Sequence, residues 1–138
     1  MHPIVKNILA VIAGLVVGSV VNIALVNLGP MVIPPPEGAD ITTMEGLKES
    51  MHLFKPMNFV FPFLGHALGT LAGAFVAAKI AATHKMKFAI GIGAFFLIGG
   101  IMMVRSIPGP AWFNILDIAA AYIPMGWLGG KWGSENEK

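Results

Sequence analysis

Four long apolar blocks, separated by short polar segments, make up most of this sequence. Each block is close to the ~20 residues that an α-helix needs to cross a bilayer. Four such blocks in a chain of 138 residues leave too little polar sequence to cover a soluble core. The pattern therefore predicts an all-α fold, a transmembrane four-helix bundle that forms a single integral membrane domain. Its spans are expected at about residues 4–28, 59–82, 88–107 and 111–130.

The only long polar segment, residues 29–58, separates the first two spans and is expected on the outer side of the membrane. Three successive prolines keep its first part extended, because proline cannot continue a helix. Thr42 and Glu45 then form a T-x-x-E capping box, and apolar residues recur at helical spacing after it. We expect a short amphipathic helix at about residues 43–54, acting as a lid, a lipid-surface helix or a partner site.

The composition agrees with a membrane location and excludes several kinds of chemistry. Hydrophobic residues make up 56% of the chain and charged residues 12%, which is about half the charged share usual in soluble proteins. The absence of cysteine excludes disulfides, thiolate catalysis and cysteine-ligated metals. The net charge of +2 comes mostly from lysines at the ends of the apolar blocks. The expected partner is therefore the lipid bilayer, and no nucleic-acid partner is inferred.

The basic residues predict how the chain is oriented. On the side of the two termini lie Lys6, Lys79, Lys85, Lys87, Lys131 and Lys138. On the other side lie Lys48, Lys55 and Arg105. Because lysine and arginine are enriched in cytoplasmic loops, both termini are expected in the cytoplasm. The chain is thus expected to be a multi-pass protein of the cell's inner (plasma) membrane.

Three segments carry a resemblance to a known family: "VIPPPEGADITTMEGLK", "FPFLGHALGTLAGAF" and "HKMKFAIGIGAFFLIGG". Together they resemble small four-span integral membrane proteins of bacteria, Bacteroidetes among them. The resemblance covers most of the chain and implies the same four-span topology. It implies no activity, cofactor or site residue.

Small residues recur every fourth position in the first two spans. Gly14 and Gly18 do so in the first span, and Gly65, Gly69 and Gly73 in the second. Within lipid, helices associate through close backbone approach rather than through the hydrophobic effect, and small residues permit that approach. This glycine-zipper pattern predicts that the first two spans pack as a tight hairpin, or that copies of the chain pack against one another.

Three spans place their most polar residue at one depth. Asn22, His66 and Asp117 each lie about six or seven residues from the outer end of their span, or ~10 Å at 1.5 Å per residue. A carboxylate in a membrane helix costs ~2.5–3.5 kcal/mol at the bilayer centre, so it should face the protein interior and find donors. We expect an intramembrane polar cluster of Asp117, His66, Asn22, Asn114, Thr70 and Arg105.

Two interpretations of this cluster remain open. Its side chains either join the helices, at about 0.6 kcal/mol for each hydrogen bond, or form a pocket open to the outside. In the second case the chain binds or transports a small solute, an ion or a proton, in a homodimer or a larger membrane complex. A non-catalytic accessory or scaffold subunit is the alternative function.

An enzyme is the third and least favoured hypothesis. His66 and Asp117 could act as an acid–base pair, but no nucleophile accompanies them in the sequence, so no catalytic residue is assigned. One deep histidine and one aspartate do not complete a tetrahedral zinc site. A bis-histidine haem needs a second deep histidine. The sequence therefore predicts neither a metal nor a cofactor.

Overall fold

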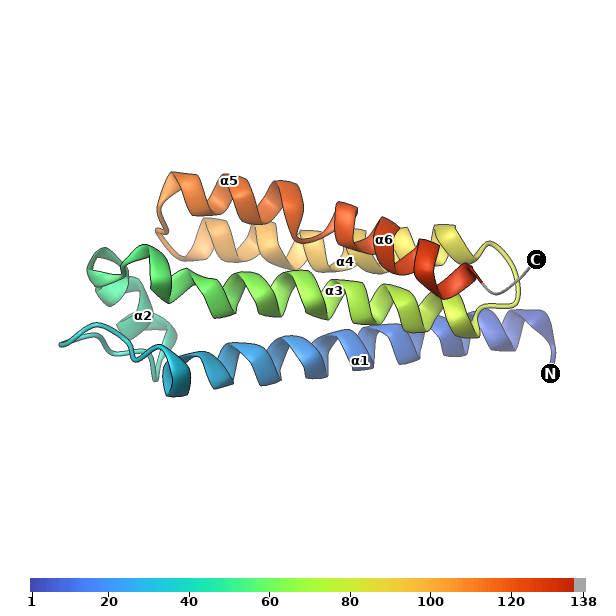
Figure 1. Cartoon of the computed structure of the whole chain (residues 1–138), viewed down its shortest axis with the longest axis horizontal. Coiled ribbons are helices and arrows are strands. Elements are labelled where there is room, and N and C mark those ends of the chain that lie inside the picture. The colour runs from blue at the N-terminus through green and yellow to red at the C-terminus, as the bar shows by residue number, and fades with distance from the viewer. Residues whose placement is uncertain (136–138) are drawn as a thin grey trace.

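The computed structural model describes residues 1–135, which form helices joined by loops, with no strand among them (Figure 1). Three segments are long and apolar enough to cross a membrane: Pro3–Val32, Pro56–Ile80 and Lys85–Ser106. The predicted all-α fold is confirmed, and so is the presence of helices suited to a membrane. The helices are α1 (Pro3–Val32), α2 (Met44–Ser50), α3 (Val60–Ile80), α4 (Lys85–Ser106), α5 (Ala111–Ala120) and α6 (Ile123–Ser134). Two short 3-10 helices, η1 (Met51–Leu53) and η2 (Pro56–Phe59), precede α3.

The fourth apolar block forms two helices rather than the single one that its hydropathy predicts. α5 ends at Ala120 and α6 begins at Ile123. Pro124 lies in the first turn of α6; it has no N–H to donate to the carbonyl of Ala120, and its ring would clash with that carbonyl in a continuous helix. The break places Tyr122 between the two helices.

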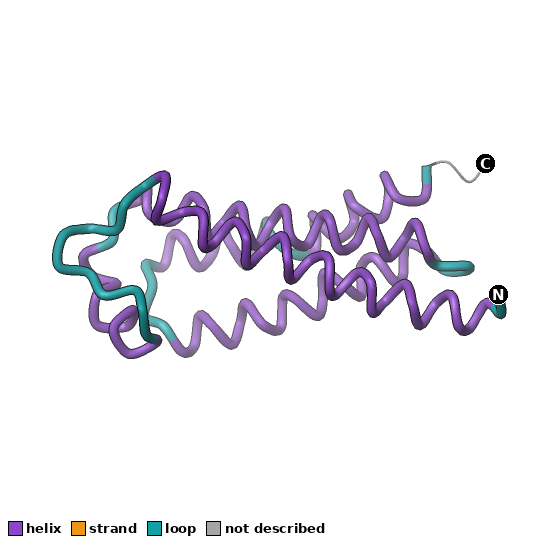
Figure 2. Tube along the Cα trace, turned by 90° about the horizontal axis from the view of Figure 1, so that it is seen from below, coloured by secondary structure: helices purple, strands orange, loops and turns teal. Residues whose placement is uncertain are grey.

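α3 is the central helix. It packs against α1 along most of its length and also contacts α4 and α6, whereas α1 and α4 contact each other only slightly. Figure 1 shows α3 between α1 on one side and α4 and α6 on the other, and Figure 2 shows the helices running side by side along the long axis of the molecule. Accordingly, 39% of the apolar window of α3 is buried, against 17% for α1.

α1 presents an apolar face to its surroundings. Ile12, Val16 and Val20 are 52%, 57% and 61% exposed, and they belong to a row that continues along the helix at helical spacing. A row of this length would be an unusually large apolar patch on a protein in water. In a bilayer it faces lipid tails, which explains how so little of a hydrophobic helix is buried.

Glycines bring the backbones of α1 and α3 into contact. A Cβ atom added to Gly73 would lie 2.5 Å from the carbonyl oxygen of Gly14, and one added to Gly69 would lie 2.8 Å from that of Gly18. Gly65 faces Asn22 in the same way, with its added Cβ 2.9 Å from the amide oxygen. The five glycines singled out in the sequence thus lie along one helix–helix contact.

The loop helix begins one residue later than its sequence signal indicates. Thr43, not Thr42, caps α2, and its hydroxyl oxygen accepts a hydrogen bond from Gly46 N at 2.9 Å. The predicted capping box of Thr42 and Glu45 is therefore wrong. The Thr42 hydroxyl and backbone N–H instead donate to Asp40, at 2.6 and 2.9 Å, in a local turn that keeps Thr42 out of the helix. Helical structure then runs through η1 to Leu53, close to the expected 43–54.

The start of α1, the α3–α4 turn and the end of α6 lie at one end of the molecule, with α2 and the α4–α5 turn at the other (Figure 1). At the first end, Asn7 Oδ1 accepts from Ala82 N at 2.8 Å, and Asn7 Nδ2 donates to Thr83 Oγ1 at 2.9 Å. Lys85 Nζ donates to the carbonyl of Ala78 in α3 at 2.8 Å and to that of the C-cap residue Ala81 at 2.6 Å. The Asn7 bonds tie α1 to the turn, and the Lys85 bonds tie the start of α4 to the end of α3. Lys138, which was counted for the orientation, lies outside the described residues.

Candidate functional site

His66 on α3 and Asp117 on α5 form a direct pair. His66 Nδ1 lies 2.8 Å from Asp117 Oδ1 and 3.0 Å from Oδ2. The hydroxyl of Tyr122 donates to Oδ2 at 3.2 Å, and its ring stacks on the imidazole with centroids 5.8 Å apart. Asp117 is only 4% exposed. A carboxylate that would be costly alone in a membrane is therefore held by two partners from the surrounding structure.

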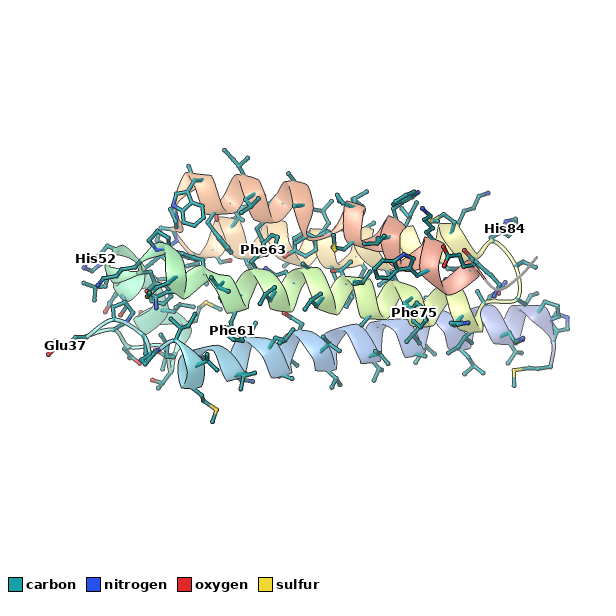
Figure 3. All side chains as sticks on the ribbon, in the orientation of Figure 1. Glu37, His52, Phe61, Phe63, Phe75 and His84 are labelled. Atoms are coloured by element: carbon teal, nitrogen blue, oxygen red, sulfur yellow. The ribbon has the colours of Figure 1, made fainter. Side chains whose placement is uncertain are left out.

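The helix break and the small residues of α4 make room for this arrangement. Tyr122 lies at the α5–α6 break, and a Cβ added to Gly100 would lie 2.5 Å from its hydroxyl oxygen. Tyr122 also packs with Ala67 and Ala121, and Phe63 lies against this group. Figure 3 shows Phe63 on the side of α3 that faces α5, with Phe61 on the side that faces α1. Apolar side chains thus surround the Tyr122 ring that lies against the polar pair.

A cavity of about 210 Å³ lies beside the pair, between α1, α3 and α4. Among its lining residues are Asn22, His66, Thr70, Phe96, Met103 and Tyr122. Two of these residues carry a buried side-chain oxygen, Asn22 Oδ1 and Thr70 Oγ1, that has no hydrogen-bond partner among the described residues. Leaving such a group unsatisfied costs ~1–3 kcal/mol, so each calls for a partner that the described residues do not supply.

The pair and the cavity share His66. Its Nδ1 faces Asp117, and no hydrogen bond reaches its Nε2 from the described part of the chain. The His66 side chain is 26% exposed and lines the cavity. With a hydrogen on Nδ1, the neutral ring carries a lone pair on Nε2. The arrangement can therefore hold a proton or accept a hydrogen bond from a molecule in the cavity.

The structure brings together four of the six predicted polar residues. Asp117 and His66 meet directly, while Asn22 and Thr70 line the cavity that His66 also lines. Asn114 lies apart, because its side-chain amide donates to the Gly109 carbonyl at 3.4 Å and closes the α4–α5 turn.

Arg105 also lies apart from the pair. Its side chain is exposed in the last turn of α4 and makes no hydrogen bond or ion pair within residues 1–135. It therefore does not reach down to Asp117 as the sequence suggested.

Sequence reasoning missed Tyr122 and Phe96. Tyr122 is the only tyrosine of the chain and follows Asp117 by five positions within an apolar block, which is a usable signal for a buried hydroxyl. Phe96 carries no such signal. It joins the cavity because Gly18 on α1 leaves room for its ring, and a Cβ there would lie 2.8 Å from Phe96 Cε2. Within residues 1–135 there is no group of three or more metal-ligating side chains.

A second cavity, of about 200 Å³, lies under the loop at the α2 end of the molecule. Leu47 of α2 and Phe54 line it together with Val26 of α1 and Phe61 of α3. Leu47 and Phe54 therefore lie over the groove between α1 and α3, whereas Met44 at the start of α2 is 49% exposed. None of the residues that line the polar cavity belongs to this loop, so the role of the loop helix as a lid stays a prediction.

The chain was also compared with protein-family models, with curated proteins and with solved structures, and none of them matches. The resemblance to small four-span bacterial membrane proteins stays a prediction.

Proposed function

We propose that this chain binds a small solute, an ion or a proton in the polar cavity between α1, α3 and α4, and that it takes part in transport across the membrane. The observation that supports this proposal is the pair of buried, unpartnered oxygens beside the His66–Asp117 pair. Side chains that serve only to join helices satisfy one another, as His66, Asp117 and Tyr122 do. Asn22 and Thr70 do not, and a ligand would satisfy them.

The broken helix adds support. In many transporters, discontinuous membrane helices form the binding site, because irregular backbone is tolerated at membrane depth only where it lines a cavity or is buried in protein. The break between α5 and α6 adjoins this cavity through Tyr122. The Asp117 carboxylate is held less than two turns before the break.

We further propose that α5 and α6 together form a fourth span, with both termini cytoplasmic in the plasma membrane. Their 10 and 12 residues amount to ~33 Å at 1.5 Å per residue, enough for a hydrocarbon core of ~30 Å. The lysine-rich end would then be cytoplasmic, and the cavity would lie in the outer half of the membrane.

Single cysteines test this topology cleanly, because the chain has none of its own. Glu37→Cys and Glu135→Cys place the same substitution at exposed positions of opposite ends. With intact cells, a membrane-impermeant maleimide should label position 37 at once and position 135 only after permeabilisation. The reverse pattern would overturn the orientation, and labelling of both in intact cells would overturn the four-span topology.

Ligand-induced stabilisation tests the binding proposal. Purified protein would be heated with ethylammonium chloride, sodium acetate or ethanol, which represent small cations, anions and neutral solutes. A solute at a hundred times its Kd stabilises the folded state by ~2.7 kcal/mol. Stabilisation should be lost in Asn22→Leu and kept in Asn27→Leu, the same change on the same helix outside this cavity. If no member of the panel stabilises the protein, or if Asn22→Leu responds like the wild type, the cavity is not a binding site.

A second function, that of an accessory or scaffold subunit, is favoured by the outer face of α4. A Cβ added to Gly91 would meet nothing within 4 Å, and Phe95 and Ile98 nearby are 57% and 60% exposed. A helix of a second copy or of a larger complex could approach closely there. Gly91→Leu should then break a complex that survives Ile98→Leu, as measured by the oligomeric state in mild detergent.

The enzyme hypothesis gains no support from the cavity. Thr70 lines it one helical turn from His66, but its hydroxyl makes no hydrogen bond to that ring. An activated nucleophile requires such a bond to its base.

A further inference from the structure

The His66–Asp117 pair carries one negative charge whenever it holds no proton, and few groups can offset that charge. α5 contributes Asp117 itself, and Tyr122 from the α5–α6 break is a neutral donor. The other lining residues carry no charge: α1 contributes Asn22 and a glycine, α3 contributes Thr70 and a glycine, and α4 contributes Phe96, Met103 and glycines. No lysine or arginine lines the cavity or bonds to the pair within residues 1–135.

An uncompensated charge in a membrane interior is costly. One proton on the pair removes it, either as imidazolium beside carboxylate or as a carboxylic acid beside neutral imidazole. A cation in the adjoining cavity removes it equally well. Either neutralises the site, and the presence of one weakens the attraction for the other.

The lining of the cavity indicates which kind of cation fits. Asn22 Oδ1, Thr70 Oγ1 and the lone pair of His66 Nε2 are all able to accept hydrogen bonds. The rings of Phe96 and Tyr122 also line it, and aromatic faces attract organic cations. Its volume of about 210 Å³ is below the roughly 300–1,000 Å³ of drug-sized sites. These features match an N–H-donating ammonium group on a short apolar chain.

We propose that the cavity binds a small alkylammonium ion in exchange for the proton of the His66–Asp117 pair. The inference rests on the proposed function and names its ligand class. When the ammonium ion enters, the proton leaves the pair for the aqueous phase, so one positive charge replaces another and no covalent bond of the ligand changes. Because one proton competes with one cation, the affinity for the ammonium ion falls as the pH falls, by at most about tenfold per pH unit.

Titration calorimetry of the purified full-length protein, with ethylammonium chloride as the probe, tests this exchange. Runs in two buffers of different ionisation enthalpy count the protons released. Sodium chloride controls for ionic strength, ethanol for the shape of the probe without its charge, and sodium acetate for the sign of the charge. We expect ethylammonium binding with release of up to one proton. Asp117→Asn should lower the affinity at least tenfold and abolish the release. Glu49→Gln, which removes an exposed carboxylate on α2, should change neither.

Each outcome decides between the two proposals. Ethylammonium binding without proton release, or equal binding by Asp117→Asn, would overturn the exchange. Binding of ethanol or acetate in place of ethylammonium would overturn the exchange and leave the binding site standing, whereas binding of no probe would overturn both. If Asp117→Asn does not fold, Thr70→Val serves instead, because it should weaken ethylammonium binding about tenfold and leave the proton count unchanged. Unweakened binding by Thr70→Val would overturn the proposed ligand contacts.

Discussion

Thr70→Val is the sharpest test of the polar cavity, because the substitution removes one hydroxyl and keeps the shape of the side chain. Thr70 is 1% exposed, and its Oγ1 has no partner within residues 1–135. A buried hydroxyl without a hydrogen bond costs ~1–3 kcal/mol relative to an apolar group of the same shape. In the absence of ligand, valine should therefore stabilise the fold by ~1–3 kcal/mol, and every 1.4 kcal/mol is tenfold in the unfolding equilibrium.

The measurement is unfolding of the purified protein in mixed micelles with increasing SDS, followed by the fluorescence of the three tryptophans. Thr43→Val provides a control of opposite sign, because it removes the hydroxyl that caps α2 and should cost ~1 kcal/mol. If Thr70→Val destabilises the ligand-free protein by more than ~1 kcal/mol, the hydroxyl is already bonded in the fold. The unsatisfied oxygen would then no longer support a binding site.

Three further predictions concern packing, the polar pair and the loop. Gly73→Ala should destabilise the fold by ~1–3 kcal/mol through overpacking, because the new Cβ would lie 2.5 Å from a carbonyl oxygen of α1. Gly91→Ala is the control: its new Cβ meets nothing within 4 Å, so it should be neutral or stabilise the fold by up to ~1 kcal/mol. Equal effects of the two substitutions in SDS unfolding would contradict the α1–α3 contact. Tyr122→Phe should cost only ~0.6 kcal/mol, since His66 still bonds the carboxylate; a loss above ~3 kcal/mol by the same assay would show that the tyrosine hydroxyl is essential to the pair. Two hydrogen bonds from Thr42, the larger effect coming from its hydroxyl and the smaller from its backbone N–H, hold the pKa of Asp40 below its ordinary value of 3.8. These hydrogen bonds therefore stabilise the loop fully above pH 3.8, and this stabilisation is lost as the pH falls through the lowered pKa of Asp40. An NMR titration that gives a pKa of 3.8 or more for the Asp40 carboxyl would refute this prediction.

The sequence by itself determined the helical character of the chain and the residues that needed partners. Stretches of ~20 apolar residues form membrane helices because backbone groups in lipid must bond within their own segment. The same reasoning indicated that Asp117 would not stand alone and pointed to His66 as a partner. Both conclusions depend on local composition and on depth along a helix, which can be counted from sequence.

Only the tertiary structure decided which side chains meet. Depth does not specify how a helix is rotated or where its neighbours cross, and so Asn114 turned to Gly109 and Arg105 to the surface. Pro124 is a sequence signal for the α5–α6 break. No sequence signal indicated that the break would bring the Tyr122 hydroxyl to Asp117. The cavity itself exists because glycines bring the backbones of α1 and α3 together, while Gly18 and Gly100 leave room for the rings of Phe96 and Tyr122. That outcome depends on the packing of several helices at once.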